Sequence, residues 1–367
     1  MELLFYNPAK IKNEIDWTAV ESIRAFYGLF SFMNDSVFFH DRTGTITTPF
    51  RSKNLFPLPA HAKNVGCSYE EIVLSRAKEL LLLSQKKQKP LGVFWSGGID
   101  STVILVALKM LETNRTALKE RVHVILSPES IREYPEFYAQ HIRGQFRIEP
   151  SHSYSEYFQN QYILVTGEGN DQLFGSQLIA SVPGEFGVDF LQNPANEETI
   201  GKFLNHAGVP HHTSDLLTAL FLRLNEKCPS GIDSVFEFMW WLNLTCKWQT
   251  VYMRMLGFLL PAGRSNIDAD FISQNYHCFF MTPEFENWSI WHKHLKIKNS
   301  LKTYKYEAKE FIFRFNQDKN YLENKVKIGS LYHIINRQAS VAAIDDSWEY
   351  HDMFPFEEVF VASNSFC

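Results

Sequence analysis

LGVFWSGGIDSTVILVALKM, residues 91–110, is the stretch of sequence that decides the fold of this chain. Its first five residues are apolar and have strand character, Ser96-Gly97-Gly98 break that run, and residues 99–110 continue with helical spacing. The stretch therefore predicts a strand, a glycine-rich turn and a helix. Glycines at such a turn let the backbone approach a ligand, and the first N–H groups of the helix have no intrahelical acceptor. This geometry favours the binding of a phosphate group.

Composition sets bounds on the class of protein. With 367 residues, 45% of them hydrophobic, the chain can bury a large core and is long enough for two domains. Its 36 basic and 41 acidic residues give a net charge of −5, so no overall field attracts nucleic acid or an anionic membrane. The five cysteines are far apart and lack zinc-site spacing, which indicates free thiols in a reducing compartment.

Targeting and membrane signals are missing from the pattern. The first residues carry acids early and lack the basic region and apolar run of a secretory signal. The longest apolar run, residues 238–246, is too short to span a bilayer. We therefore expect a cytoplasmic protein that does not enter a membrane and has little tendency to bind nucleic acid.

The first ninety residues predict a small sheet followed by a helix. Aromatic and β-branched residues separated by turn signals indicate antiparallel strands at 27–33, 36–40 and 44–49, so residues 1–66 are expected to form a small β-rich segment. Ser68 and Glu71 have the spacing of a capping box and predict the start of a helix that ends before Pro90.

The middle of the chain alternates between strand and helix patterns. Strands are expected at 122–126 and 162–166, with a helix over 135–142 between them. Such alternation predicts parallel strands, with a ligand at their carboxyl ends, where Ser96, Ser127 and Thr166 would lie. We therefore expect an α/β fold, a twisted parallel sheet with flanking helices, in a nucleotide-binding core over residues 67–190. From residue 191 the period becomes helical and predicts an all-helical part up to residue 367.

A second glycine-rich turn follows the strand at 162–166. It reads TGEGNDQLFG, residues 166–175, and carries the carboxylates Glu168 and Asp171. Acids beside a phosphate-binding loop would repel the ligand unless a hard cation bridges them to it. We therefore predict that Asp100 of the first loop and Asp171 of the second hold Mg²⁺.

Together, the two turns resemble a known family. SGGIDS, residues 96–101, is similar to the SGGxDS loop of the ATP pyrophosphatase (PP-loop) superfamily, which has an adenine nucleotide alpha hydrolase-like fold. GEGNDQLFG, about seventy residues later, resembles the GEGxDExFGG motif of the synthetase domain of asparagine synthetases. Gln172 replaces the usual acid and Ser176 the final glycine. The matching positions of the second motif are Gly167, Glu168, Gly169, Asp171, Phe174 and Gly175.

The resemblance implies an ATP-dependent ligase. A carboxylate of a small substrate would attack the α-phosphorus of ATP, giving an acyl-adenylate and pyrophosphate, and ammonia or an amine would then attack the acyl carbon. Glu168 would accept a proton from that nitrogen. The stretch YLENKVKIGSLY, residues 321–332, resembles the late basic motif of the family, in which Lys327 would reach the α-phosphate and Lys325 stands in the place of an arginine. The residues expected to bind ATP are Ser96, Gly97, Gly98, Ile99, Asp100, Ser101, Ser127, Thr166 and Gly167.

The source of nitrogen is a point of difference from the family. Members that hydrolyse glutamine begin with a catalytic cysteine on an N-terminal domain, whereas here Glu2 follows Met1 and no cysteine precedes Cys67. Residues 28–49 resemble only the closing strands of that domain. We therefore expect free ammonia, an amine, or ammonia from a separate subunit to serve as donor.

Two other functions stay open at this stage. One is a different PP-loop activity on a nucleobase or nucleic acid, against which the lack of a basic run and of zinc-spaced cysteines argues. The other is a nucleotide-binding relative that has lost catalysis, which Gln172 and the short spacing between the two loops favour. The acid and the amine are also open, because lasso-peptide cyclases and β-lactam-forming enzymes use the same scaffold on other carboxylates.

Overall fold

The computed structural model describes most of the central part of the chain and short pieces of its ends. The described residues are 3–6, 40–46, 48, 52–59, 66–111, 115–151, 161–175, 186–206, 208–257, 269–297, 304–325, 343–345 and 350–351.

The chain divides into two compact units, each built from separated segments. We call residues 63–170 and 264–339 the sheet unit, and residues 1–62, 171–263 and 340–367 the helical unit. The sequence instead predicts three consecutive segments. The chain passes from one unit to the other within the short helix α9 (Asn170–Phe174), at the second glycine-rich turn.

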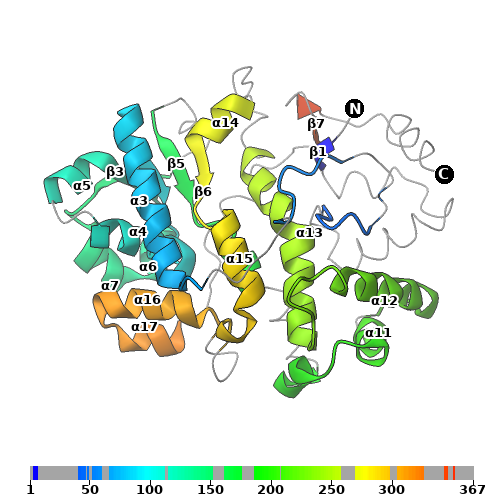
Figure 1. Ribbon diagram of the computed structural model, residues 1–367. Helices are drawn as coiled ribbons and strands as arrows, with labels where there is room; N and C mark the ends of the chain where they lie inside the picture. Colours follow the sequence, from blue (N-terminus) through cyan, green and yellow to red (C-terminus); the bar gives the residue numbers. More distant parts are fainter. Residues whose placement is uncertain are drawn as a thin grey trace. The chain divides into compact units, whose positions relative to one another are not determined.

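A five-stranded, all-parallel sheet forms the centre of the sheet unit, which confirms the predicted α/β class (Figure 1). Its order is β4-β3-β2-β5-β6, and Leu91 at the start of β2 lies opposite Val122 and Ile163 of the two neighbouring strands. The central strands β2, β3 and β5 are buried along their length, as expected where helices cover both faces of a parallel sheet. The strands are β2 (Leu91–Phe94), β3 (Val122–Leu126), β4 (Arg147–Pro150), β5 (Ile163–Thr166) and β6 (Tyr276–Cys278).

Strand β6 corrects the expectation that the chain after residue 190 is all helical. Only three residues long, it is too short to produce a periodic pattern, yet it pairs in parallel with β5 from Leu164 to Thr166. The pairing therefore depends on the neighbouring strand more than on the local sequence.

Helices flank this sheet. The helix α3 (Tyr69–Lys87) begins with the predicted capping box, in which Ser68 accepts from the backbone N–H of Glu71 and the Glu71 side chain accepts from that of Ser68. It packs against α4 (Ile99–Leu111) and α16 (Tyr306–Asn316), which pack against each other (Figure 1). The predicted helix 135–142 forms as α7 (Pro135–Phe137) continued by the π-helix η1 (Tyr138–Ile142). The remaining helices are α5 (Arg115–Arg121), α6 (Pro128–Glu133), α14 (Ala269–Asn275), α15 (Pro283–Trp291), η4 (Lys293–Leu295) and α17 (Lys319–Asn324).

The helical unit contains an antiparallel sheet that differs from the predicted one. β1 (Leu3–Tyr6) pairs with β7 (Ala343–Asp345), which pairs with β8 (Tyr350–His351), so this sheet joins the two ends of the chain. The strands predicted at 27–33 and 36–40 lie outside the described residues except for His40, which is not in a strand.

The strand predicted at 44–49 is wrong for its described residues, which form bends and irregular backbone. The carboxylate of Asp41 accepts the backbone N–H groups of Thr43, Thr45 and Ile46 at 2.8, 2.6 and 2.8 Å. Amides that are held by a side chain in this way are not available to a strand ladder.

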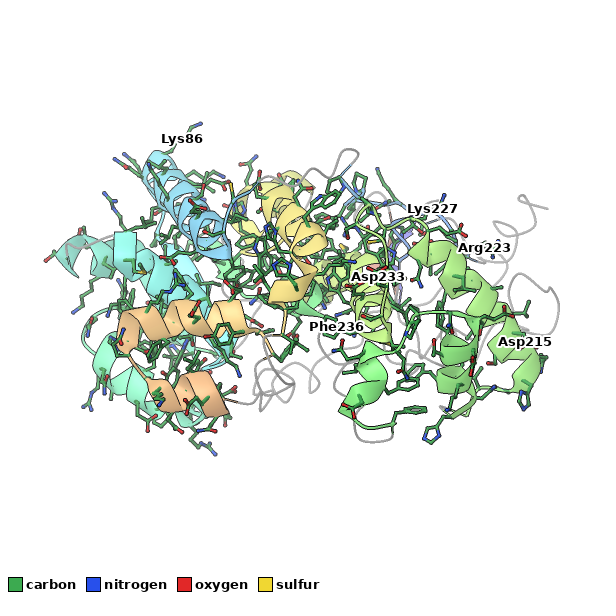
Figure 2. The ribbon with its side chains drawn as sticks, turned by 60° about the horizontal axis from the view of Figure 1, so that its bottom comes forward. Lys86, Asp215, Arg223, Lys227, Asp233 and Phe236 are labelled. Carbon is green, nitrogen blue, oxygen red and sulfur yellow. The ribbon has the colours of Figure 1, made fainter. Side chains whose placement is uncertain are left out.

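Long helices make up the described core of the helical unit. The predicted stripes over 214–228 and 233–256 form α12 (His211–Asn225) and α13 (Val235–Gly257), which follow η2 (Val188–Gln192) and α11 (Glu197–His206). The indole N–H of Trp241 donates to the Leu224 carbonyl at 2.7 Å and so joins α13 to α12. Phe236 is buried at the start of α13, whereas Asp215, Arg223 and Lys227 are exposed (Figure 2). Among the described helices, none combines the length and hydropathy that a membrane crossing requires.

Candidate functional site

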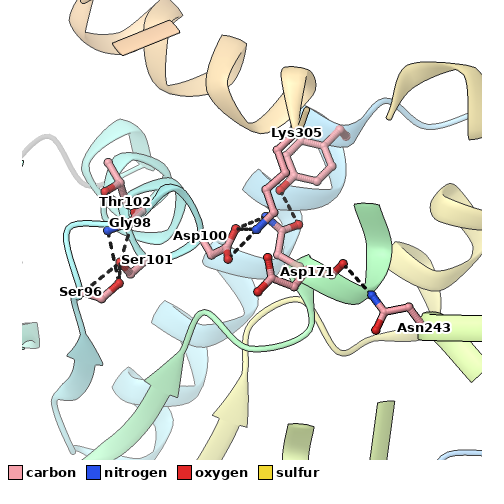
Figure 3. Close-up of polar contacts among 10 residues, drawn as sticks. Ser96, Gly98, Asp100, Ser101, Thr102, Asp171, Asn243 and Lys305 are labelled. Carbon is pink, nitrogen blue, oxygen red and sulfur yellow. Dashed lines mark hydrogen bonds and ion pairs between the residues drawn. The ribbon is translucent and has the colours of Figure 1, made fainter. Parts of the chain in front are cut away.

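The first glycine-rich loop connects β2 to α4 and is braced by its own hydroxyl groups (Figure 3). The backbone N–H of Ser96 donates to Oγ of Ser101 at 3.1 Å. Oγ of Ser101 and Oγ1 of Thr102 donate to the Gly98 carbonyl at 3.3 and 2.8 Å. The first turn of α4 thus has a fixed position, and its N–H groups without intrahelical acceptors form a favourable place for an anion.

Gly97 is the point at which this loop is pressed against α6. Its φ of +76° lies in the left-handed region, and a Cβ built on it would lie 2.4 Å from the carbonyl oxygen of Ser130 and 2.8 Å from Cβ of Glu133. The conformation and the space both require glycine here. The loop therefore depends on α6 for its shape.

The second glycine-rich turn packs directly on the first loop, within the sheet unit. A Cβ built on Gly167 would lie 3.0 Å from both Cβ of Asp100 and the backbone nitrogen of Ser101. Nδ2 of Asn170 donates to Oδ1 of Asp100 at 2.7 Å, and Oδ1 of Asn170 accepts from the Tyr69 hydroxyl at 3.1 Å. The structure thus brings together the two motifs that are about seventy residues apart. Sequence reasoning missed Asn170, because it occupies the variable position of the second motif.

Asp100 is also held by a lysine that the sequence did not single out. Nζ of Lys305 lies 2.6 and 2.7 Å from the two carboxylate oxygens of Asp100, and the Lys305 side chain is only 2% exposed (Figure 3). A buried ammonium group is costly unless it is paired, so this contact is the reason that Lys305 can lie there. Lys305 is the N-cap residue of α16, with a left-handed φ of +57°, so it lies outside the helical stripe that buries Ala308 and Ile312 and the helical period gives no signal for it.

Two further buried lysines accompany Lys305. Lys309, one turn along α16, is 2% exposed, and burial, followed by the charges of Lys305 and Lys325, lowers its pKa to about 8. The positive charges of Lys305 and Lys325 thus both act on Lys309.

Lys325 is paired with Glu133 beside the first loop. Its Nζ lies 3.3 Å from Oε1 of Glu133 and donates to the Glu133 carbonyl at 3.0 Å, with side chains 8% and 3% exposed. Burial lowers the pKa of Lys325, although the Glu133 carboxylate acts in the opposite direction. A Cβ built on Gly98 would be 3.6 Å from Oε1 of Glu133, which places this ion pair next to the loop. Lys327, the lysine expected to reach the α-phosphate, lies outside the described residues.

The other predicted ligands of ATP in this unit are engaged within the protein. Ser127 is the N-cap of α6, where its Oγ accepts from the Ser130 N–H at 3.4 Å. Oγ1 of Thr166 donates to Sγ of Cys278 at 3.5 Å. Ile99 is buried at the start of α4, so it can offer a ligand only its backbone.

Glu168, the expected proton acceptor, lies half-buried in the turn between β5 and α9. It is close enough to Tyr276 that its charge contributes to a raised pKa of that hydroxyl, although burial is the larger cause. Its reach to an acyl carbon stays a prediction.

The described residues do not test the magnesium prediction. Both oxygens of Asp100 hold Lys305, and Asp171 belongs to the other unit, where its carbonyl accepts from Nδ2 of Asn243 at 3.3 Å (Figure 3). Within the described part of the chain, no three His, Cys, Asp or Glu side chains gather as a metal site would need. Joint binding of Mg²⁺ by Asp100 and Asp171 therefore stays a prediction.

Comparisons with known proteins leave the family open. No protein-family model matches this chain, and no curated protein matches it. The resemblance to asparagine synthetases thus rests on the two glycine-rich motifs and the late basic motif alone.

Proposed function

We propose that this protein is an ATP-dependent, amide-forming ligase of asparagine synthetase type. One observation carries the proposal: the turn with Gly167 lies so close to the first turn of α4 that an added Cβ would be 3.0 Å from Asp100 and Ser101. The two motifs of the resemblance therefore share one edge of the parallel sheet, the carboxyl edge at which such folds bind ligands.

The first loop is proposed to hold the phosphates of ATP through the backbone N–H groups at the start of α4. Buried lysines near the loop support this role, because an anion would offset the positive charges of Lys305 and Lys325 that act on Lys309. Glu168 is proposed to take the proton of the attacking nitrogen, and Lys327 to offset charge on the α-phosphate. Mg²⁺ is kept as a proposed cofactor that accompanies ATP.

The proposed substrates are a small carboxylate and ammonia or an amine, with a separate subunit as one source of ammonia. We place the protein in the cytoplasm. Four described cysteines, Cys67, Cys228, Cys246 and Cys278, are free thiols, which supports a reducing compartment.

A second candidate is nucleotide binding without catalysis. Two observations favour it: Lys305 takes both oxygens of the carboxylate expected to hold the metal, and Gln172 stands where the motif has an acid. In that case ATP would bind to the loop without any carboxylate-dependent release of pyrophosphate.

The test is exchange of labelled pyrophosphate into ATP by the full-length protein, measured against a panel of carboxylic acids. At least one acid should start the exchange if adenylation occurs. Absence of exchange with every acid, together with measurable ATP binding, would overturn the ligase and favour the second candidate. ATP binding should be measured in the same preparations.

Glu168→Gln separates the two half-reactions. Because Glu168 is assigned to the nitrogen step, the variant should keep exchange and lose amide formation. Glu136→Gln, which changes an exposed acid of α7, is the matched control and should keep both. Loss of exchange in Glu168→Gln would contradict the assigned role.

A further inference from the structure

Asp100 poses an electrostatic problem for the proposed phosphate site. It lies in the first turn of α4, directly among the N–H groups that would receive an anion. A carboxylate there is stabilised by the helix terminus but repels an incoming phosphate over the same short distance. The usual solution is a bound divalent cation. Among the described residues, however, no three His, Cys, Asp or Glu side chains gather to hold one.

Lys305 supplies a different solution. Its ammonium group contacts both oxygens of Asp100, at 2.6 and 2.7 Å, and it is almost wholly buried. Asn170 donates a further hydrogen bond to Oδ1 of Asp100, and Tyr69 fixes the orientation of that amide. The carboxylate is therefore neutralised by the protein itself.

We propose that Lys305 is a charge-compensating residue that keeps the loop at residues 96–101 able to bind a pyrophosphate group without a divalent cation. This inference rests on the proposed nucleotide site but not on ligase activity. The ligand class is a diphosphate, either free pyrophosphate or the terminal phosphates of a nucleotide. Lys305 acts through Asp100 and is thus a positioning residue.

Charge compensation makes a prediction that direct contact between Lys305 and phosphate does not. Lys305→Met leaves the carboxylate of Asp100 uncompensated and should weaken anion binding. Adding Asp100→Asn removes that charge, so the double variant should regain binding. If Lys305 instead touched the phosphate, the double variant would still lack that contact and would stay well below the wild type.

The experiment is calorimetric titration of the full-length protein with inorganic pyrophosphate, in EDTA and in excess Mg²⁺. In EDTA, Lys305→Met should bind at least about tenfold more weakly than the wild type, and Asp100→Asn/Lys305→Met should return to within about threefold of it. Repeating the titration with ATP in EDTA distinguishes a nucleotide from free pyrophosphate as the better ligand.

Arg314→Met is the matched control. It removes a cation of α16, the helix that Lys305 caps, from ion pairs with Glu70 and Glu310. Position 314 is nine residues from Lys305, roughly 13 Å along α16, beyond the screening length at physiological salt. Pyrophosphate binding by this variant should match the wild type. Urea unfolding of each variant separates an effect on binding from a loss of fold.

Four results would overturn the inference. The first is pyrophosphate binding only in the presence of Mg²⁺. The second is a double variant that still binds weakly, and the third is an Arg314→Met variant that binds as weakly as Lys305→Met. Each of these would overturn the inference but leave the nucleotide site intact. Binding in neither condition would overturn the inference and the nucleotide site together. Failure of the ligase proposal is seen separately, as absent exchange in a protein that still binds pyrophosphate.

Discussion

Replacing Gly97 by alanine tests whether α6 fixes the shape of the first loop. The added Cβ would lie 2.4 Å from the carbonyl oxygen of Ser130 and 2.8 Å from Cβ of Glu133. The nearer atom belongs to the backbone of α6, so it cannot move aside as the end of a flexible side chain would. Residue 97 also has a φ of +76°, which alanine adopts only with strain.

The expected cost has two parts. The left-handed backbone costs a non-glycine residue about 1–2 kcal/mol. Inserting a methyl group into a packed region costs about 1–3 kcal/mol more, because the loop or α6 must shift. Gly97→Ala should therefore lower the free energy of unfolding by about 2–5 kcal/mol.

Gly144→Ala separates these two parts. Gly144 has nearly the same φ, +73°, and belongs to the same unit, but no atom lies within 4 Å of the position that its added Cβ would take. This substitution should carry only the backbone cost, about 1–2 kcal/mol. Urea unfolding followed by tryptophan fluorescence measures both variants, and Trp95, buried directly before the loop, reports on this region.

The result that would refute the reasoning is equal destabilisation by the two substitutions. It would mean that α6 does not press on Gly97 and that the loop has room to adapt. A destabilised Gly97→Ala that binds pyrophosphate as the wild type does would likewise contradict the idea that loop shape governs the anion site.

Three other predictions concern charge and capping. Glu133→Gln or Lys325→Met should each cost about 3–5 kcal/mol in the free energy of unfolding, because each leaves a buried charge unpaired, and the double variant should cost less than the sum; additivity in urea unfolding would argue against the pair. The pKa of Lys309 is lowered to about 8, so between pH 8 and about 10.5 this residue binds fewer protons in the folded than in the unfolded protein. The free energy of unfolding of the wild type, relative to that of Lys309→Met, should therefore rise over that interval. A constant difference between pH 7 and about 9.5 would contradict this prediction. Ser68→Ala should destabilise α3 by about 1 kcal/mol, measured by urea unfolding, while Ser68→Asp, which still accepts the capping bond, should not.

Local signals determined a large part of the sheet unit. The apolar runs before each glycine-rich turn predict β2 and β5, and the alternation with helices predicts their parallel pairing. The capping box of Ser68 and Glu71 predicts the start of α3 correctly. These features follow from contacts within a few residues, or from a repeated strand–helix order, and both are visible in a sequence.

The site itself was only half determined by sequence. The two glycine-rich motifs indicate an anion site. Because the sequence shows no cation near Asp100 and Asp171, it predicts that these two carboxylates bind a metal ion. Lys305, 205 positions from Asp100, is the cation that the sequence could not assign. It stands at the N-cap of α16, one residue before the helix begins, so the helical period does not assign it to a buried face.

Tertiary structure alone decided the partners of the buried charges. Lys305 meets Asp100 across 205 residues, Lys325 meets Glu133 across 192, and Asn170 meets Asp100 across 70. Strand β6 likewise joins the sheet through its parallel pairing with β5, which its own short sequence does not predict. The sequence by itself predicted most of the strands and helices around the two glycine-rich turns and indicated a candidate anion site. The fold decided which charges are paired there, because a buried charge is tolerated only beside a partner that packing brings from elsewhere in the chain.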